Sequence, residues 1–421
     1  MRILLVNPNR YRTPPVMPLG LEHLAEALRQ NSSHEARILD LCFADDPSAA
    51  LNAELERFEP QVAALTVRNI DTTLYNNNVF FLDEIKAMAD LLKGHGVPVV
   101  LGGAGFSFSP RGVLEYLGAE WGISGPGDKA LVHLLDLLET GPPPAGTILN
   151  GWQWGADPDL QIVRPVSGID CRAYQAWGGI FGFETQKGCL ANCSYCPEGS
   201  GRVIFRNPRR IVEELKGLCE LGFTDYHLCD SEFNQDLRFC REFLETLIKS
   251  GLSISWALYM KTSPYDEELF RLLKRSGANL VTLSVPSGQD SLAHAAEIRA
   301  LCAKHGIRLA VDFFSGFPGE TADQVRSAIE SLRRIRPETV GVNTFIRLIE
   351  GTTVTQEVLG SSEHRKYVLG ELADNRYLLR PVFYNRITVE SLREMIGEDP
   401  VFRIEGFERT TNYERLRSSG V

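Results

Sequence analysis

A regular alternation of short apolar segments with amphipathic ones restricts the fold of this chain more than any other feature. Over the first 140 residues, segments that are apolar throughout alternate with segments whose apolar residues recur at helical spacing. Short, wholly apolar strands are typical of a parallel sheet covered by helices on both faces. Strands are expected at residues 3–7, 37–41, 62–67, 97–101 and 121–124, and helices at residues 19–29, 47–58, 80–93, 110–117 and 129–138. This α/β pattern predicts a doubly wound, flavodoxin-like parallel sheet, whose ligands bind beyond the carboxyl ends of the strands.

A second alternation begins near residue 180. Strands are expected at residues 180–185, 225–229, 253–259, 280–285, 308–314 and 339–345. Helix-start signals lie between them: Asn207-Pro208, Ser263-Pro264 with Gly277 after the end of that helix, and a capping box of Thr321 and Gln324. These repeats predict a partial (β/α)6 barrel with its chemistry at the carboxyl ends of the strands.

The two alternations divide the chain into four predicted parts. Residues 1–140 form the Rossmann-like domain, and residues 141–168, rich in Pro, Gly and Trp, form a linker packed on a surface. Residues 169–350 form the barrel. Residues 351–421 form a C-terminal segment that closes the active site, with residues 345–354 and 380–385 as candidates to line a substrate pocket. Arg347 and Tyr384 could touch substrate there, although surface pairing and core packing are the more common roles of these residue types.

Composition excludes several classes of protein. Hydrophobic residues make up 43% and charged residues 23%, as in soluble globular proteins. The net charge of −10 argues against nucleic acid as a partner, because phosphate binding needs a basic face. No apolar run approaches the roughly 18 residues that a membrane span needs, and the N-terminal apolar run is too short for a secretory signal. Nine unevenly spread cysteines favour reduced thiols. We therefore expect a cytoplasmic protein. We also expect a monomer or a homodimer.

Three of the nine cysteines lie within eight residues, as Cys189-x-x-x-Cys193-x-x-Cys196. They follow the first predicted barrel strand, on a loop at the catalytic end. Three thiolates on one loop can hold three irons of a [4Fe-4S] cluster, which usually has four cysteine ligands. The fourth iron then takes a distant ligand or stays open for a small chelating molecule. The alternative is a structural zinc site completed by His227 and Cys229, although such sites more often show paired Cys-x-x-Cys units.

This spacing, with Tyr195 before the last cysteine, resembles the radical S-adenosylmethionine (SAM) superfamily. The resemblance implies that the amino and carboxylate groups of SAM chelate the fourth iron. It implies that an electron from a flavodoxin- or ferredoxin-type donor cleaves SAM to a 5′-deoxyadenosyl radical, with Tyr195 beside the adenine.

Further segments resemble the SAM site of this superfamily. In "DSEFN", Ser231 and Glu232 are expected near the SAM amino group, and the Glu232 carboxylate would pair with its positive charge. Tyr259 and Lys261 end the third strand and could reach the SAM ribose or carboxylate, although a solvated lysine is equally consistent with the sequence. The remaining expected SAM residues are Ser284, in "LSVPSGQDS" where relatives often carry Gly-x-Glu-Ser, and Gly316 and Phe317 in "GFPGET".

Four loops of the first domain follow predicted strands, so they meet at one edge of the sheet. Together they resemble the cobalamin-binding domain that precedes the radical SAM domain in one branch of the superfamily. The Asp-x-His-x-x-Gly motif that supplies a histidine to cobalt is absent, and His23 lies inside a helix as a surface or packing residue. Arg68 could lie near the corrin face or pair with Asp71. The expected cobalamin residues are Arg68, Asn69, Gly102, Gly103, Phe106, Gly125 and Gly127.

The combined resemblance implies a class B radical SAM methyltransferase. Such an enzyme methylates an unactivated carbon of a small molecule or natural product, using SAM, a [4Fe-4S] cluster and cobalamin. The alternative is a cobalamin-free dehydration or epimerisation, for example of an aminoglycoside, with the first domain as a scaffold. An RNA methylthiotransferase would need more N-terminal cysteines, and this chain has only Cys42 before residue 171.

Overall fold

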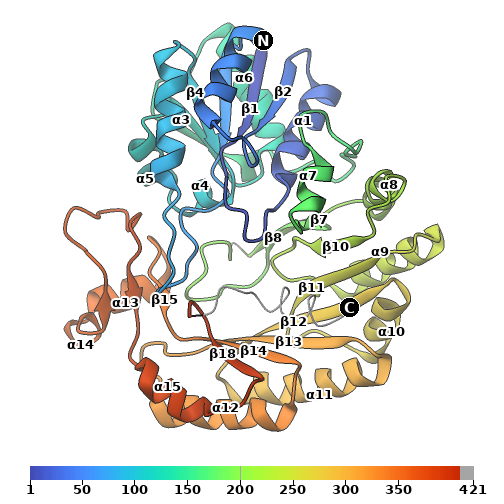
Figure 1. Cartoon of the computed structure of the whole chain (residues 1–421), viewed down its shortest axis with the longest axis vertical. Coiled ribbons are helices and arrows are strands. Elements are labelled where there is room, and N and C mark those ends of the chain that lie inside the picture. The colour runs from blue at the N-terminus through green and yellow to red at the C-terminus, as the bar shows by residue number, and fades with distance from the viewer. Residues whose placement is uncertain (200, 408–421) are drawn as a thin grey trace. The chain divides into compact units, whose positions relative to one another are not determined.

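The structure is a computed structural model that describes residues 1–199 and 201–407 (Figure 1). The chain packs into two compact units that interleave along the sequence. The first comprises Met1–Thr72, Val79–Lys187 and Ile204–Phe223; the second comprises Thr73–Asn78, Gly188–Val203 and the chain from Thr224 onward. The division of the sequence at residues 140, 168 and 350 stays a prediction. None of the helices in the described part of the chain is long and apolar enough to cross a membrane.

The first unit contains a parallel sheet in the order β2-β1-β3-β4-β5-β6. This order confirms the predicted flavodoxin-like fold. Ile3, Leu4, Leu5 and Val6 of β1 have no exposed surface, as expected of a central strand covered on both faces. The strands are β1 (Arg2–Asn7), β2 (Glu35–Asp40), β3 (Val62–Thr66), β4 (Val99–Gly102), β5 (Trp121–Ser124) and β6 (Thr147–Asn150).

Strand β6 corrects the prediction of five strands, because it lies inside the predicted linker. It pairs with β5 from Trp121↔Thr147 to Ser124↔Asn150. A strand of four residues with Thr and Asn at its ends does not stand out from a loop until its partner is known.

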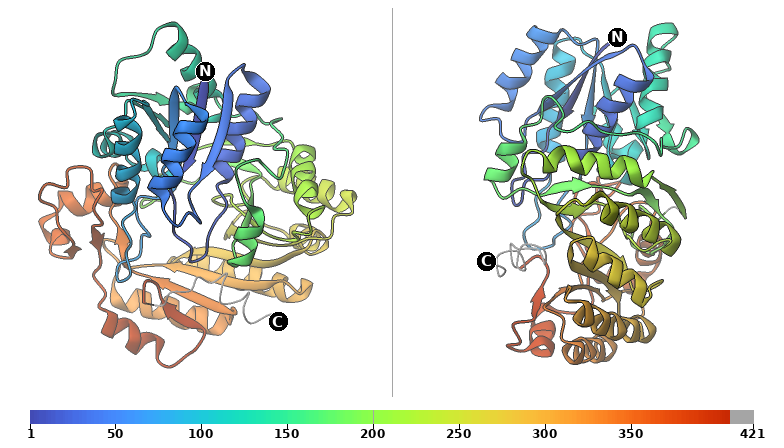
Figure 2. Two further views of the ribbon diagram at one scale, coloured as in Figure 1. Left: turned by 45° about the horizontal axis from the view of Figure 1, so that its top comes forward. Right: turned by 90° about the vertical axis from the view of Figure 1, so that its right-hand side faces the viewer.

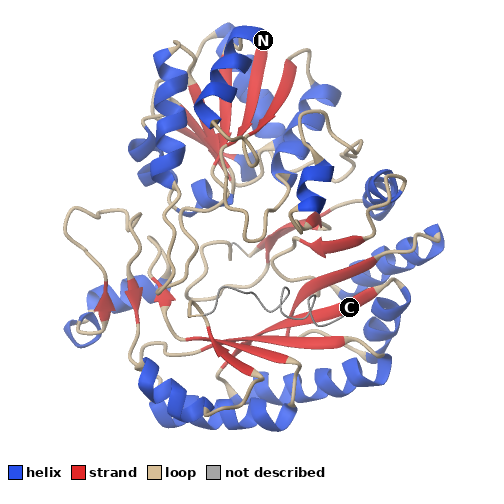
Figure 3. Ribbon diagram, viewed as in Figure 1, coloured by secondary structure: helices blue, strands red, loops and turns tan. Residues whose placement is uncertain are grey.

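Helices cover both faces of this sheet (Figure 3). Asp46 is the N-cap of helix α2, because its side chain accepts a hydrogen bond from the Ala49 N–H. Asn207 caps α8 in the predicted way, accepting from the Arg209 N–H at 3.0 Å. The helices of the unit are α1 (Leu19–Asn31), α2 (Pro47–Phe58), α3 (Leu82–Gly94), α4 (Ala104–Phe108), α5 (Pro110–Leu117), α6 (Asp128–Thr140), η1 (Gly151–Gln153), α7 (Cys171–Ala176) and α8 (Pro208–Cys219). Strand β7 (Phe181–Phe183) also belongs to this unit.

The second unit contains parallel strands in the order β18-β14-β13-β12-β11-β10, with helices along one face (Figures 1 and 2). This is the open parallel sheet expected of a partial barrel. Its strands are β10 (Asp225–Leu228), β11 (Ser255–Lys261), β12 (Ala278–Pro286), β13 (Arg308–Phe314), β14 (Thr339–Asn343) and β18 (Phe402–Ile404), and its helices are α9 (Leu237–Ser250), α10 (Glu267–Arg275), α11 (Gln289–His305) and α12 (Ala322–Ile335). A two-stranded sheet joins β8 (Gln186–Cys189) to β9 (Arg202–Phe205).

The predicted helix caps of this unit are partly right. Thr321 and Gln324 form the predicted capping box at α12. The prediction that Ser263-Pro264 opens a helix is wrong: α10 begins at Glu267, because the Asp266 carboxylate accepts from the Leu269 N–H at 2.9 Å. Gly277 follows the end of that helix with a φ of 91°, as predicted.

The chain after residue 345 is more ordered than its sequence suggests. An antiparallel sheet has the order β15-β17-β16, and β18 adds a strand beside β14 in the large sheet. Tyr384 is buried in a cluster with Ile346 and Leu348. Arg347 is also buried and donates to the carbonyls of Leu378 (2.9 Å) and Leu379, so both side chains have packing roles. The elements are β15 (Ile346–Arg347), α13 (Thr353–Gly360), α14 (Ser362–Arg365), β16 (Val368–Leu369), β17 (Phe383–Tyr384) and α15 (Val389–Ile396).

Candidate active site and cofactor-binding loops

The cysteine loop begins at the end of β8. Hydrogen bonds hold its backbone on both sides of Cys189. Cys189 is buried, Cys196 is half-buried and Cys193 is exposed. The Gln235 side chain accepts from the Leu190 N–H at 2.5 Å and donates to the Gly188 carbonyl at 3.2 Å. Gln235 therefore brackets Cys189, a role that the sequence analysis missed.

The loop folds closely on itself. The Cys196 N–H donates to the Cys193 carbonyl at 3.1 Å. A Cβ at Gly199 would lie 2.6 Å from the Ala191 carbonyl oxygen, so this position requires glycine. Further along the chain, the Val354 N–H donates to the Ser194 carbonyl at 2.9 Å. These contacts hold the three thiols on one compact loop.

Backbone amides point at two of the three sulfurs. The Ala191 N–H donates to Cys189 Sγ at 3.4 Å, and the amides of Glu198 and Gly199 interact with the Cys196 sulfur. Burial raises the pKa of both thiols, that of Cys196 to about 11, while these amides act in the opposite direction by favouring the thiolate. Hydrogen bonds to sulfur are among the features that tune iron–sulfur centres.

Three thiols on one loop are a donor set that suits a [4Fe-4S] cluster. Among residues 1–199 and 201–407, no three His, Cys, Asp or Glu side chains gather closely enough to hold one metal ion. In a [4Fe-4S] cluster each thiolate binds a different iron, so the sulfurs need not converge on one point. A zinc site requires four ligands around one centre. Cys189, Cys193 and Cys196 are therefore the residues that would hold a cluster.

Tyr195 contacts two aromatic rings of the second unit. Its ring stacks on Phe314, with centroids 5.2 Å apart, and lies tilted against Phe317, with centroids 5.5 Å apart. Phe317 belongs to the "GFPGET" turn, where the Glu320 carboxylate accepts from the N–H groups of Gly316 and Phe317, the latter at 3.2 Å. Gly316 has a φ of 83°, which favours glycine. Glu320 thus shapes the turn, and the sequence analysis did not single it out.

A row of residues in register crosses the second sheet, with one residue from each of five neighbouring strands. Successive register pairs join Lys261 to Ser284, Ser284 to Asp312, Asp312 to Gly341 and Gly341 to Arg403. Side chains two residues apart on a strand share a face, so Asp312 shares its face with Phe314, the residue that stacks on Tyr195. The row therefore lies on the same face as the cysteine loop, and we call it the polar row.

Glu232 lies beside the polar row. Burial raises its pKa to about 7, against the opposing effects of a hydrogen bond with Ser284 and of the Lys261 charge; the Asp312 charge raises it further. Ser231, the next residue back, donates to Glu198 of the cysteine loop at 2.8 Å. Four of the predicted SAM residues, Ser231, Glu232, Lys261 and Ser284, thus lie close to one another or to the cysteine loop. Their contacts with SAM stay predictions.

Tyr259 precedes Lys261 on the same face of β11. It forms a hydrogen bond with Asp312, whose charge holds the pKa of the tyrosine well above its usual range. The His227 ring contacts the Tyr259 ring edge-on, with the ring centroids 5.7 Å apart. Burial alone lowers the pKa of His227 to about 4, which keeps this imidazole neutral.

The predicted cobalamin loops converge at the carboxyl edge of the first sheet. The Gly105 N–H donates to the Arg68 carbonyl at 2.9 Å, and a Cβ on Gly105 would lie 2.9 Å from the Asn69 backbone. Gly103 has a φ of 98°, and a Cβ there would lie 2.6 Å from the Val67 carbonyl oxygen. The loops after β3 and β4 are thus in direct contact through glycines.

The loop after β5 joins this group. The Gly125 N–H donates to Ser107 Oγ of α4 at 2.9 Å, and Gly125 has a φ of 86°. Gly127 ends the loop immediately before α6. The prediction that Phe106 contacts cobalamin is disfavoured, because its ring is wholly buried and fills the space where a Cβ on Gly122 would be. Its role is core packing.

His23 confirms the packing role expected from its place in a helix. It is buried in α1, with its Nε2 2.9 Å from a Glu184 carboxylate oxygen. Burial lowers its pKa, with the Lys187 charge acting in the same direction. This imidazole is engaged inside the first unit.

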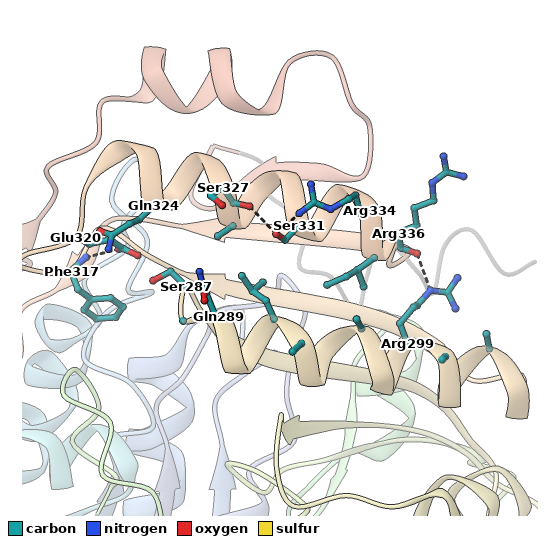
Figure 4. A pocket seen from close by; sticks show the side chains of 18 of the residues that line it. Ser287, Gln289, Arg299, Phe317, Glu320, Gln324, Ser327, Ser331, Arg334 and Arg336 are labelled. Atoms are coloured by element: carbon teal, nitrogen blue, oxygen red, sulfur yellow. Dashed lines mark hydrogen bonds between the residues drawn. The ribbon is translucent and has the colours of Figure 1, made fainter.

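A groove lies between α11 and α12, outside the polar row (Figure 4). It has a volume of about 1290 Å³ and is lined by small residues such as Ala296 and Ser327. Arg299 Nε donates to the Arg336 carbonyl at 2.9 Å, so part of its charge is engaged. The groove holds none of the predicted cluster or cobalamin residues, and of the predicted SAM residues only Phe317 reaches its rim.

Two protein-family matches agree with the assignment of the cysteine loop and of the glycine-rich loops of the first unit. Residues 11–135 match the B12 binding domain family, and residues 183–332 match the radical SAM superfamily. The chain is a radical SAM enzyme with a B12-binding domain. Its cofactors are accordingly SAM, a [4Fe-4S] cluster and cobalamin.

The chain is also similar to individual relatives and solved structures. It is 26% identical to the tryptophan 2-C-methyltransferase of Streptomyces laurentii over 437 residues, which cover 82% of this chain and 72% of that protein. The structure of the radical SAM methyltransferase TsrM from Kitasatospora setae, with cobalamin and a [4Fe-4S] cluster bound, has a TM-score of 0.86 and 24% identity, and covers 96% of this chain and 92% of that one. TsrM with tryptophan and aza-SAM gives a TM-score of 0.83 at 25% identity, over 94% of this chain and 87% of that one. The radical SAM enzyme described here has the same fold.

Proposed function

We propose that this enzyme transfers the methyl group of SAM, by way of cobalamin, to a carbon of a small aromatic amine, with tryptophan as the first substrate to test. The observation that carries the proposal is the presence of two separate cofactor platforms in one chain. One is the loop of Cys189, Cys193 and Cys196, and the other is the set of glycine-rich loops around Arg68 and Gly103. A cobalamin-free enzyme has no use for the second platform.

When bound, the cluster supplies single electrons to SAM and the corrin supplies a carrier for the methyl group. The residues of the chain bind and orient. Tyr195 offers a flat apolar ring for an adenine, and Glu232 offers a carboxylate that could accept a hydrogen bond from the SAM amino group.

The substrate class rests on the tryptophan named for the Streptomyces laurentii relative and for the TsrM complex. The carboxylates of Glu232 and Asp312 in the second unit suit a substrate that carries an amine. All nine cysteines lie within the described residues, and none of them forms a disulfide. We therefore propose a reduced, cytoplasmic setting with a flavodoxin- or ferredoxin-type electron donor.

The test begins with anoxically reconstituted protein that is incubated with hydroxocobalamin and desalted. Retained corrin absorption supports the proposal, and its loss contradicts it. The protein is then given reductant, tryptophan and SAM labelled in its methyl group, and label is sought in the small-molecule fraction. Formation of 5′-deoxyadenosine with no label in any product would favour the cobalamin-free dehydration or epimerisation instead.

A further inference from the structure

The loop between β3 and α3, residues 67–81, contributes to both units. Its tip, Thr73–Asn78, packs with the second unit, whereas the chain on either side of the tip packs with the first. Arg68 and Asn69, two of the expected cobalamin residues, lie at the start of this loop. The segment that begins in a cobalamin loop is therefore held at its tip by the second unit.

Backbone pairing closes the base of the loop within the first unit. The Thr72 N–H donates to the Val79 carbonyl at 3.1 Å, and the Val79 N–H donates to Thr72 Oγ1 at 3.1 Å. Asp71 and Phe80 form an isolated antiparallel bridge beside these bonds. A two-stranded pairing is marginally stable by itself even when it is longer than this. The geometry of the base therefore depends on what holds the tip.

Aromatic contacts hold the tip within the second unit. The Tyr75 ring stacks on Phe345, with ring centroids 4.5 Å apart and an interplanar angle of 2°, and meets the Phe383 ring edge-on, with centroids 5.4 Å apart. Asn77 Nδ2 donates to the Gly406 carbonyl at 2.8 Å. Phe345 and Phe383 are buried, while Tyr75 is 39% exposed. Stacked and edge-on rings attract one another beyond the area that they bury, so a fixed apolar platform anchors a ring that is otherwise open to solvent.

The backbone is strained where the chain enters the tip. Thr73 has a φ of 56°, in the left-handed region that residues other than glycine rarely adopt. Such a conformation persists only where surrounding contacts fix it, and it is concentrated at functional segments. The contacts of Tyr75, two residues further on, suit this purpose.

We propose that Tyr75 is a positioning residue for the cobalamin site. Its ring anchors the tip on the two phenylalanines, and the anchored tip keeps Arg68 and Asn69 in the conformation that binds the cofactor. This inference rests on the proposed function, because it takes those two residues as cobalamin residues. Coupling between binding events is reciprocal, so bound cobalamin in turn favours the anchored tip.

The first test measures the affinity for hydroxocobalamin by equilibrium dialysis on the full chain loaded with its cluster. In Tyr75→Ala, we expect the dissociation constant to rise about tenfold, a typical coupling between two sites, while the affinity for SAM stays unchanged. Tyr75→Phe keeps the stacked ring and should bind hydroxocobalamin nearly as the wild type does. Asn76→Ala is the matched control, because Asn76 is the exposed neighbour of Tyr75 at the same tip, and its affinity should not change.

The second test measures amide hydrogen exchange in the cobalamin-free protein. The bonded amides of Thr72 and Val79 belong to the first unit. We expect them to exchange about tenfold faster in Tyr75→Ala than in wild type, because release of the tip opens the base. Should Tyr75→Ala fail to fold, Asn77→Ala replaces it in both tests, since it removes the bond to Gly406 and should loosen the same tip.

Several outcomes overturn the inference. They are wild-type cobalamin affinity in Tyr75→Ala, an equal loss in Tyr75→Phe, an equal loss of SAM affinity, and unchanged exchange at the base of the loop. All of them arise in a chain whose wild type binds corrin. The proposed function fails separately, when the wild type itself retains no corrin or transfers no methyl group from SAM to any small molecule. The two failures can therefore be told apart.

Discussion

Tyr195 stacks on Phe314 with ring centroids 5.2 Å apart and an interplanar angle of 22°. Phe314 ends β13, two residues beyond Asp312 on the same face. This contact joins the cysteine loop to the polar row, so the residues that would hold the cluster lie on the same side of the second sheet as Asp312.

Replacing Tyr195 should weaken SAM binding by the loss of a stacking surface. We expect Tyr195→Ala to raise the dissociation constant of SAM about tenfold, because stacking of an aromatic ring on a base contributes about 1–3 kcal/mol. Tyr195→Phe keeps the ring and should bind SAM nearly as the wild type does. Equilibrium dialysis on the cluster-loaded protein measures both, and equal losses in the two variants would argue against stacking.

Removing one cysteine of the trio should abolish stable cluster binding. In Cys196→Ser, we expect the visible absorption of the reconstituted cluster and most of the bound iron to disappear after desalting, together with methyl transfer. Cys219→Ser is the control, since Cys219 ends α8 and lies outside the loop. Iron analysis and the visible spectrum report the result. A Cys196→Ser protein that retains a full complement of iron would contradict the assignment.

Gly199→Ala should disturb the cysteine loop without touching a thiol. The added Cβ would lie 2.6 Å from the Ala191 carbonyl oxygen, a backbone atom that cannot move alone. We expect a loss of about 1–3 kcal/mol, the usual cost of overpacking, and lower iron content after reconstitution. Gly360→Ala is matched to it, because Gly360 lies in helix α13 with nothing within 4 Å of the added Cβ. If the melting temperature and the iron content change equally in Gly199→Ala and Gly360→Ala, this explanation is wrong.

The first unit depends on a buried ion pair. Arg164 donates to Glu22 at 2.7 Å, and both side chains are essentially inaccessible. Burial raises the pKa of Glu22 in spite of the arginine. Glu22→Ala should cost about 3–5 kcal/mol, because it leaves a buried charge without its counterion.

Urea unfolding of Glu22→Ala and of the wild type measures this cost. Arg29→Ala provides the comparison: Arg29 is exposed and Glu26 keeps a hydrogen bond from Gln30, so loss of the Arg29–Glu26 pair of the same helix should cost at most about 1 kcal/mol. The double variant Glu22→Leu/Arg164→Met should recover part of the loss. A double variant less stable than Glu22→Ala would be inconsistent with this reasoning.

His227 should make the protein more sensitive to acid. Its pKa is about 4 in the folded chain, below the usual 6.5. Above pH 6.5 the residue is neutral in both states and costs nothing. As the pH falls from 6.5 towards 4, only the unfolded chain takes up the proton, so stability is lost across this window. Between pH 7 and pH 5 the loss is about 1–2 kcal/mol.

The measurement is urea unfolding of apoprotein at pH 7 and pH 5. His227→Gln should remove this part of the pH dependence, so the stability difference between the two pH values shrinks relative to wild type. His133→Gln serves as the control, since His133 belongs to α6 of the first unit. An unchanged pH dependence in His227→Gln would show that the imidazole is not held neutral by burial.

Local pattern was enough to predict much of this protein. The central strands of both sheets are short apolar runs, and the ends of α8 and α12 carry caps formed by residues two or three positions apart. The cysteine loop is equally local, since its three ligand residues lie within eight positions. Such features depend on neighbours in the chain, and spacing along the sequence reports them directly.

What only the tertiary structure decided depends on strand register. Asp312 and Arg403 belong to β13 and β18, and nothing in their local sequences places them in one row with Lys261. Strand β18, with three residues, and β6, with four, carry too little pattern to be predicted without the partner strand that supplies their hydrogen bonds. Gln235 and Glu320 likewise act on backbone groups that the fold brings to them. Hydrogen bonding between strands is non-local, so the sequence determined which elements form, and packing determined which polar groups meet.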